Sequence, residues 1–429
     1  RLGLGEVEAS VAALHESAKA LGSEYVIALE GVVRARPQGT INPKLPSGTV
    51  EVQAASFTIL NRSETPPFEI DDQAQISEDV QMAWRFLDLR RPASQEKLLL
   101  RHRITQALRG TLDGLGFIEV ETPILTKSTP EGARDYLVPS RVNPGKFYAL
   151  PQSPQLFKQL LMVAGLERYF QFARCFRDED LRADRQPEFT QLDLELSFVQ
   201  EADIFNCLEQ LLARMFKAVL GIELALPFPR LTHQEAMQRH QSDKPNLRDE
   251  GHPWAFVWIT DFPLFHWNAD EKRWDSEHHP FTSPNPDDVE LLDRDPGKVR
   301  SRAYDLVLNG TELGSGSIRI HNAELQRDML HRIGLDDQTI DERFGFLLKA
   351  LRHGAPPHGG FAIGIDRLVA MVAGCESIRD VIAFPKTQKA VCPLTGAPSD
   401  VAPGQLKDLH LSVIARPKAA SQEGSSHGK

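Results

Sequence analysis

Long apolar runs are absent from this sequence of 429 residues. A helix that spans a bilayer needs about 18 or more consecutive apolar residues, and no such stretch occurs, so we expect no transmembrane helix. The first residues, Arg1 to Gly5, also lack the apolar core of a secretory signal peptide. Together these two absences predict a cytoplasmic protein.

Cysteine is scarce, and positive charge is outnumbered by negative charge. The four cysteines, Cys175, Cys207, Cys375 and Cys392, form no CxxC pair, so neither a zinc site nor a disulfide framework is expected. Lys and Arg total 49 against 59 for Asp and Glu, which gives a net charge of -10. An acidic chain binds nucleic acid poorly by charge alone, although a local basic surface can still hold RNA by its shape.

The composition changes along the chain, and its length exceeds that of one ordinary core, so we expect at least two domains. Residues 4–22 have the composition of a helix. The strand-like runs Tyr25–Arg36 and Thr49–Asn61 enclose a stretch rich in Pro, Gly and Asn, which favours a long hairpin loop. From Ser94 onward, a helix predicted at about Glu96–Leu115 is followed by strands and helices without βαβ alternation, and this order predicts an α+β fold.

The stretch from Arg174 to Glu195 is predicted to form a strand, a loop and a second strand. In the second strand, Gln191, Asp193 and Glu195 share one face and leucines share the other, because successive side chains alternate. An apolar floor below a polar row is typical of a binding cleft. A solvated sheet face would also explain the alternation, but not the density of arginines and acids in the loop.

Two carboxylates, Asp305 and Glu312, are spaced so that a regular strand would place them on opposite faces. A bulge or a turn, for which Asn309-Gly310 is well suited, would bring both to one cation. Two carboxylates with open coordination positions fit Mg²⁺ held partly by substrate phosphates. Taken alone, an ordinary acid pair in a turn is the simpler interpretation.

Three other stretches are weak signals by themselves. The run Gly359–Gly364 leads into a predicted helix that begins near Arg367, and its glycines would admit a ligand close to the backbone, although no GxxxxGK[ST] loop is present. In an extended loop His278 and His279 point opposite ways, so at most one would line a given pocket. Residues 116–123 are most simply interpreted as core and turn.

The order and spacing of these stretches are more specific than any one of them. Those that end at Pro123, Glu195 and Leu368 resemble motifs 1, 2 and 3 of class II aminoacyl-tRNA synthetases, and most closely those of bacterial-type aspartyl-tRNA synthetases. The strings Ser128–Asp135 and Gln152–Lys158 add to the resemblance, which covers nearly the whole chain.

The resemblance implies an antiparallel sheet flanked by helices, an N-terminal OB-type β-barrel and a homodimer built around motif 1. The implied domains are a partial OB-type anticodon-binding domain at 1–64, a linker or hinge at 65–93, a class II catalytic domain at 94–416 and a disordered tail at 417–429. The start of the family's barrel is missing, and so is the large inserted domain of bacterial members, expected near 248–253.

The resemblance further implies that ATP and Mg²⁺ serve as cofactors in the activation of L-aspartate and in its transfer to the 3′-OH of the terminal adenosine of tRNA(Asp), with tRNA(Asn) as a second acceptor. The implied aspartate site comprises Glu131, Gln155, Lys158, Arg177, Asp193, His278 and Arg319. The implied ATP site comprises Arg177, Asp178, Glu179, Gln186, Glu312, Gly364, Ile365, Asp366 and Arg367. Asp305 and Glu312 would hold the metal, and Arg177 and Arg367 would be catalytic.

Two other interpretations stay open. A related class II synthetase for asparagine or lysine conflicts with Lys158 and Arg319, because lysine would meet two cations and asparagine would leave their charges unpaired. A non-catalytic paralogue that binds RNA or a protein partner is consistent with the incomplete barrel and the missing domain. The ATP and amino-acid positions are nevertheless filled by the expected residue types, which favours an enzyme.

Overall fold

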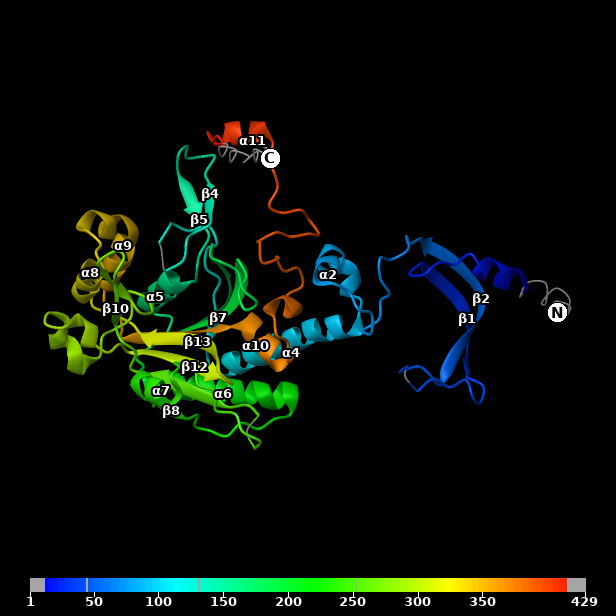
Figure 1. The fold of residues 1–429 in the computed structure, drawn as a ribbon, viewed down its shortest axis with the longest axis horizontal. Helices are drawn as coiled ribbons and strands as arrows, with labels where there is room; N and C mark the ends of the chain where they lie inside the picture. Colours follow the sequence, from blue (N-terminus) through cyan, green and yellow to red (C-terminus); the bar gives the residue numbers. More distant parts are fainter. Residues whose placement is uncertain (1–11, 44, 130–131, 252, 415–429) are drawn as a thin grey trace, which may run out of the picture. The chain divides into compact units, whose positions relative to one another are not determined.

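The computed structural model describes residues 12–43, 45–129, 132–251 and 253–414, and the chain divides into two compact units, Arg1–Pro92 and Ala93–Lys429 (Figure 1). The predicted tail and the start of the predicted first helix lie outside the described residues. In the part of the chain that the structure describes, no helix is long and apolar enough to cross a bilayer.

The first unit contains a β-hairpin. Its strands, β1 (Val26–Ala35) and β2 (Val50–Asn61), pair in antiparallel fashion and agree with the two predicted strand runs. They form a two-stranded sheet of their own, so the expected OB-type barrel is not confirmed. The segment expected to be a linker contains two short helices, α2 (Glu78–Ala83) and α3 (Arg85–Asp88).

The second unit is built on an eight-stranded sheet whose strand order is β3-β6-β7-β14-β13-β12-β9-β8. The two edge pairs are parallel and all inner pairs are antiparallel, as the resemblance implied. The strands are β3 (Ile118–Glu119), β6 (Arg168–Phe176), β7 (Glu188–Ser197), β8 (Arg230–Thr232), β9 (Phe256–Thr260), β12 (Ala303–Leu308), β13 (Thr311–Ile318) and β14 (His358–Gly364).

Helices cover the apolar face of this sheet. Helices α4 (Pro92–Gly114), α6 (Glu201–Leu220) and α10 (Ile365–Val372) pack on it (Figure 1), and the leucines of β7 belong to the same buried cluster. Burial of these side chains contributes most to the stability of the unit.

The second unit contains further helices and two small hairpins besides these elements. They are α5 (Gln155–Val163), α7 (His233–His240), α8 (Ala323–Arg332), α9 (Asp337–Leu351), α11 (Pro403–Asp408), η1 (Pro286–Leu292), η2 (Pro296–Lys298), η3 (Ile378–Val381), and the hairpins β4 (Leu137–Pro139) with β5 (Phe147–Ala149) and β10 (Phe265–Asn268) with β11 (Arg273–Ser276).

The opposite face of the sheet is polar and hollowed along β14. Its neighbour β7 presents Gln191, Asp193 and Glu195 there, because Leu192 and Leu194 point into the helical core. On β14 the residues that share this face are small: they are Gly360, Ala362 and Gly364. The result is a trough between the acidic row of β7 and the polar row of β13.

Gly360 is the position where the trough needs a glycine. A Cβ there would lie 1.9 Å from Oε2 of Glu195 and 2.3 Å from the carbonyl oxygen of Leu194. Both neighbours are held in the sheet, since Gly360 pairs directly with Glu195. The floor of the trough therefore has no room for one additional carbon atom.

We expect Gly360→Ala to lower the free energy of unfolding by about 1–3 kcal/mol, because overpacking forces the strand or Glu195 to move. The measurement is urea-induced unfolding. Gly345→Ala, in helix α9, is the matched control, since a Cβ there meets no atom within 4 Å. The control should be neutral or stabilising by up to roughly 1 kcal/mol. Equal stability of the two variants would contradict this view of the floor.

Candidate active site

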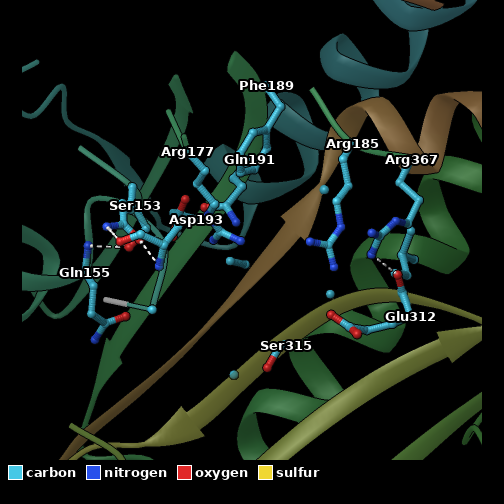
Figure 2. A pocket seen from close by; sticks show the side chains of 18 of the residues that line it. Ser153, Gln155, Arg177, Arg185, Phe189, Gln191, Asp193, Glu312, Ser315 and Arg367 are labelled. Carbon is cyan, nitrogen blue, oxygen red and sulfur yellow. Dashed lines mark hydrogen bonds between the residues drawn. The ribbon is translucent and has the colours of Figure 1, made fainter. Parts of the chain in front are cut away.

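A cavity of about 490 Å³ lies over the trough (Figure 2). Helix α5, the loop between β6 and β7, and strands β7, β13 and β14 contribute to its walls. The predicted site residues that line it are Gln155, Lys158, Arg177, Glu179, Gln186, Asp193, His278, Glu312, Arg319, Gly364, Asp366 and Arg367. The sequence motifs thus converge on one cavity although they are far apart along the chain.

Four charged groups form a buried network at one end of the cavity. Arg319 binds both carboxylate oxygens of Glu195, with Nε 2.9 Å from Oε1 and Nη2 3.2 Å from Oε2. The Lys158 ammonium lies 3.0 Å from Oδ1 of Asp193 and 3.4 Å from Oε2 of Glu195. All four side chains are at most 2% exposed. Two positive and two negative charges therefore balance in a region where an unpaired charge is very unfavourable.

The electrostatics of this network differ between its two carboxyls. Burial acts to raise the pKa of Glu195, but the charges of Arg319 and Lys158 outweigh it and hold that pKa below its usual range. Burial dominates at Asp193 and raises its pKa, although Lys158 opposes the effect. Oδ2 of Asp193 is buried and has no hydrogen-bond partner among the described residues. An additional cationic donor in the cavity would satisfy it.

His279 contributes a neutral imidazole to the same end of the cavity. Its Nε2 lies 2.8 Å from Nη1 of Arg319, and because a guanidinium can only donate, Nε2 must accept. Burial and the nearby charge of Arg319 lower the pKa of His279 well below its ordinary value. The same Arg319 nitrogen donates to Ser317 Oγ at 2.7 Å. Arg319 is thus oriented on several sides by Glu195, His279 and Ser317.

The expectation that at most one of the paired histidines lines a given pocket is wrong. Both His278 and His279 line the cavity. The chain turns here instead of running extended, with the Thr282 amide donating to the His279 carbonyl. His278 has a different hydrogen-bond partner from His279: its Nε2 lies 3.1 Å from Oδ1 of Asp305. Burial alone would lower the pKa of His278, but the charge of Asp305, its hydrogen bond and the charges of Glu277 and Glu312 together raise that pKa.

Arg185 and Arg367 lie towards the other end of the cavity, and Arg177 lies between them and Asp193 in the view of Figure 2. The Arg177 guanidinium lies over the ring of Phe189, 5.1 Å from its centroid. Arg367 donates from Nη1 to the backbone carbonyl of Glu312 at 2.5 Å. The Nε atoms of Arg177 and Arg367 are buried and without a hydrogen-bond partner among the described residues. Donors of this kind fit an anionic ligand such as a polyphosphate.

The two predicted metal ligands lie on one face of the sheet. The turn at Asn309 and Gly310 has positive φ at both residues, and the β12–β13 register shifts between Leu306 and Val307. Val307 therefore pairs with Glu312 and Asp305 pairs with Ser315, which puts Asp305 and Glu312 on the same side.

These two carboxylates suit Mg²⁺ completed by phosphate oxygens, since that ion is usually bound by one or two carboxylates together with substrate. The described residues contain no group of three or more His, Cys, Asp or Glu side chains that could hold a metal by themselves. Glu312 lines the cavity. Asp305 does not line it, and its carboxylate forms a hydrogen bond with His278 instead.

Several predicted ATP residues have structural partners of their own. The side-chain amide of Gln186 bonds both backbone groups of Lys386, and Asp366 accepts from the Thr190 amide and from Arg101. The side chain of Ile365 is fully buried in the helical core, so only its backbone could contact a ligand. Asp178 does not line the cavity, and Glu131 lies outside the described residues.

Sequence reasoning assigned no role to Glu195, His279 and Lys244. Glu195 had a detectable signal, because it follows Asp193 on the same face of β7. Lys244, which reaches Glu312 at 2.8 Å, comes from an irregular segment without any pattern that marks it. No local sequence feature predicts that contact.

The family model described as tRNA synthetases class II (D, K and N) matches residues 77–388. A relative from Moorella thermoacetica, called Aspartate--tRNA(Asp/Asn) ligase, is 45% identical over 94% of this chain and 88% of its own length. The relative of the same name from Syntrophotalea carbinolica is 44% identical over 94% and 89%. The Moorella alignment has 527 positions, more than the 429 residues here, so that relative contains residues without a counterpart in this chain.

Solved structures also resemble the model. The asparaginyl-tRNA synthetase from Pyrococcus horikoshii complexed with asparaginyl-adenylate has a TM-score of 0.70 and 24% identity, and the match covers 87% of this chain and 85% of that one. The aspartyl tRNA synthetase from Entamoeba histolytica has a TM-score of 0.65 and 22% identity, with 85% and 78% covered. At these identities the likeness establishes the fold.

We expect Glu195→Gln to lower the free energy of unfolding by about 3 kcal/mol or more, since it leaves buried cations without their carboxylate. Chemical denaturation measures this loss. Glu188→Gln is the control on the same strand, because Glu188 pairs with Lys386 and Arg174 near the surface and should contribute less than about 1 kcal/mol. If both variants were equally stable, the buried charges would contribute no more to stability than the ion pairs near the surface.

Proposed function

We infer that this chain, which belongs to the class II tRNA synthetases (D, K and N), activates L-aspartate with ATP and transfers it to tRNA. The observation that carries the proposal is the buried end of the cavity, where Lys158 and Arg319 lie opposite an unpartnered oxygen of Asp193. Cationic donors next to a free carboxylate oxygen complement an amino acid with an acidic side chain.

Aspartate recognition follows from the charge balance of the network. The α-ammonium of the substrate binds Asp193, helped by Gln155 and Glu131, and the side-chain carboxylate binds Lys158 and Arg319. Positive and negative charges are then equal, because Glu195 already compensates one of the cations. Asparagine would leave one positive charge in excess at a buried site, and lysine would add another, so both are discriminated against. His278 closes the pocket.

ATP binds at the arginine-rich end. Arg177 holds the α-phosphate and the substrate α-carboxylate together, Arg367 holds the γ-phosphate, and Glu179 and Gln186 support the adenine end. Asp305 and Glu312 would hold Mg²⁺, which would neutralise phosphate charge. A carboxylate oxygen of aspartate attacks the α-phosphorus in line, the new oxygen–phosphorus bond forms, and pyrophosphate leaves. The protein contributes alignment and charge stabilisation.

In the second step the 3′-OH of the terminal adenosine attacks the activated carbonyl and AMP leaves. The relatives are named as ligases for tRNA(Asp/Asn), which supports charging of both tRNAs by this chain. Their names also favour an enzyme over a non-catalytic paralogue.

We place the reaction in the cytoplasm. We also propose a homodimer through α4 and β3, where Leu99 and Ile118 are about half exposed.

The first test is aspartate-dependent exchange of pyrophosphate into ATP. We expect exchange with aspartate and Mg²⁺, and background levels with asparagine or lysine, because only aspartate balances the buried charges. Charging of purified tRNA(Asp) and tRNA(Asn) then measures tRNA choice. Absence of exchange with every amino acid, in a folded preparation, would contradict the proposal.

Two substitutions test the roles of Arg177 and Arg319 separately. Arg177→Ala should reduce exchange by at least about 100-fold, since it removes a donor to the charge that develops at the α-phosphate. Arg319→Leu should abolish aspartate use while ATP binding, measured by calorimetry, stays within a few-fold, because the residue is at the other end of the cavity. Aspartate exchange near the wild-type rate in either variant would refute the corresponding assignment.

A further inference from the structure

The segment between α7 and β9 is attached to the β12–β13 turn. Asn309 donates from its side chain to the Pro253 carbonyl at 3.0 Å and accepts from the Ala255 amide at 2.9 Å. Its own amide donates to the Ala255 carbonyl at 3.0 Å. Gly310 lies against Asn246: a Cβ at Gly310 would be 3.1 Å from the Cβ of Asn246. The turn that precedes Glu312 therefore fixes the path of a segment remote from it in sequence.

Lys244 lies on the same segment, two residues before Asn246, and lines the cavity. Its ammonium lies 2.8 Å from Oε2 of Glu312, and the two side chains are 41% and 29% exposed. The Glu312 carbonyl is held at the same time by Arg367. The backbone of Glu312 is thus fixed and its carboxylate is occupied by a cation.

That cation conflicts with the role proposed for Glu312. A divalent ion on the same carboxylate would lie close to the ammonium, and two cations at such a distance repel strongly outside bulk water. Lysine has a flexible stem and a point charge that can move between partners. Because Lys244 is partly exposed on the arginine-rich side of the cavity, phosphate oxygens are the partners it can reach there.

We propose that Lys244 is a substrate-binding residue with two positions: it neutralises Glu312 in the metal-free enzyme, and it moves to a phosphate oxygen of ATP when the metal binds Glu312. The inference rests on the proposed function, since it needs ATP in this cavity and a metal on Glu312. It follows that the ligand-free enzyme resists the metal alone, and that metal and nucleotide bind together.

The test is Lys244→Met, which keeps the length of the stem and removes the charge. Two binding constants are measured: Mn²⁺ to the ligand-free enzyme, by the electron paramagnetic resonance signal of the free ion, and ATP in the presence of a chelator, by calorimetry. We expect Mn²⁺ to bind roughly five- to tenfold more tightly and ATP to bind more weakly by a similar factor, as for a partly exposed charge. A structural role alone would not shift the two constants in opposite directions.

Lys217→Met is the matched control, because Lys217 pairs with Glu223 at 2.7 Å on the surface of α6, outside the cavity. It should leave both constants unchanged. Lys244→Gln should repeat the methionine result, and Lys244→Arg should stay close to the wild type.

Unchanged constants in Lys244→Met, weaker binding of both ligands, or no measurable Mn²⁺ binding in either protein would overturn the proposal. Failure of the proposed function has a separate signature: the wild type itself would show no aspartate-dependent exchange.

Discussion

A single buried carboxylate, Glu195, determines how the cavity floor is organised. It pairs with Gly360 in the sheet and binds both Arg319, which directly follows β13, and Lys158, which lies on α5. A cation buried without such a partner would be strongly destabilised, so neither cation could stand at this depth alone. The aspartate site is therefore a property of three elements held together by one side chain, and its specificity depends on charge balance across all of them.

The other end of the cavity is controlled by an irregularity of the backbone. The tight turn at Asn309 and Gly310 places Asp305 and Glu312 on the same face, because Glu312 pairs with Val307, two residues from Asp305, whereas one continuous strand would separate them. The side chain of the same Asn309 bonds Pro253 and Ala255, in the segment that follows Lys244. One turn thus places the two carboxylates on one face and also contacts the segment that contains Lys244.

Much of this could be predicted from the sequence, because strand alternation is a local signal. The polar row of β7, the glycine-rich β14 and the need for an irregularity between Asp305 and Glu312 all follow from the period of two. The pairing of Glu195 with Arg319, the shared pocket of His278 and His279, and the core position of Ile365 depend on tertiary packing or on loop path. Lys244 is the extreme case, since its contact with Glu312 joins two segments that are far apart in the sequence. In the described residues of the first unit, a two-stranded hairpin stands where the resemblance implied a barrel.

The small residues of β14 have a consequence for how such a cavity can change over evolution or in the laboratory. Gly360 has no side chain to remove and no space to add one, so the floor can become neither deeper nor shallower by substitution there. A cavity of this kind can be adapted to a longer or shorter amino acid only from its walls, on α5 or at the paired histidines. A change of substrate size therefore requires substitutions in α5 or at the paired histidines, while the floor stays the same.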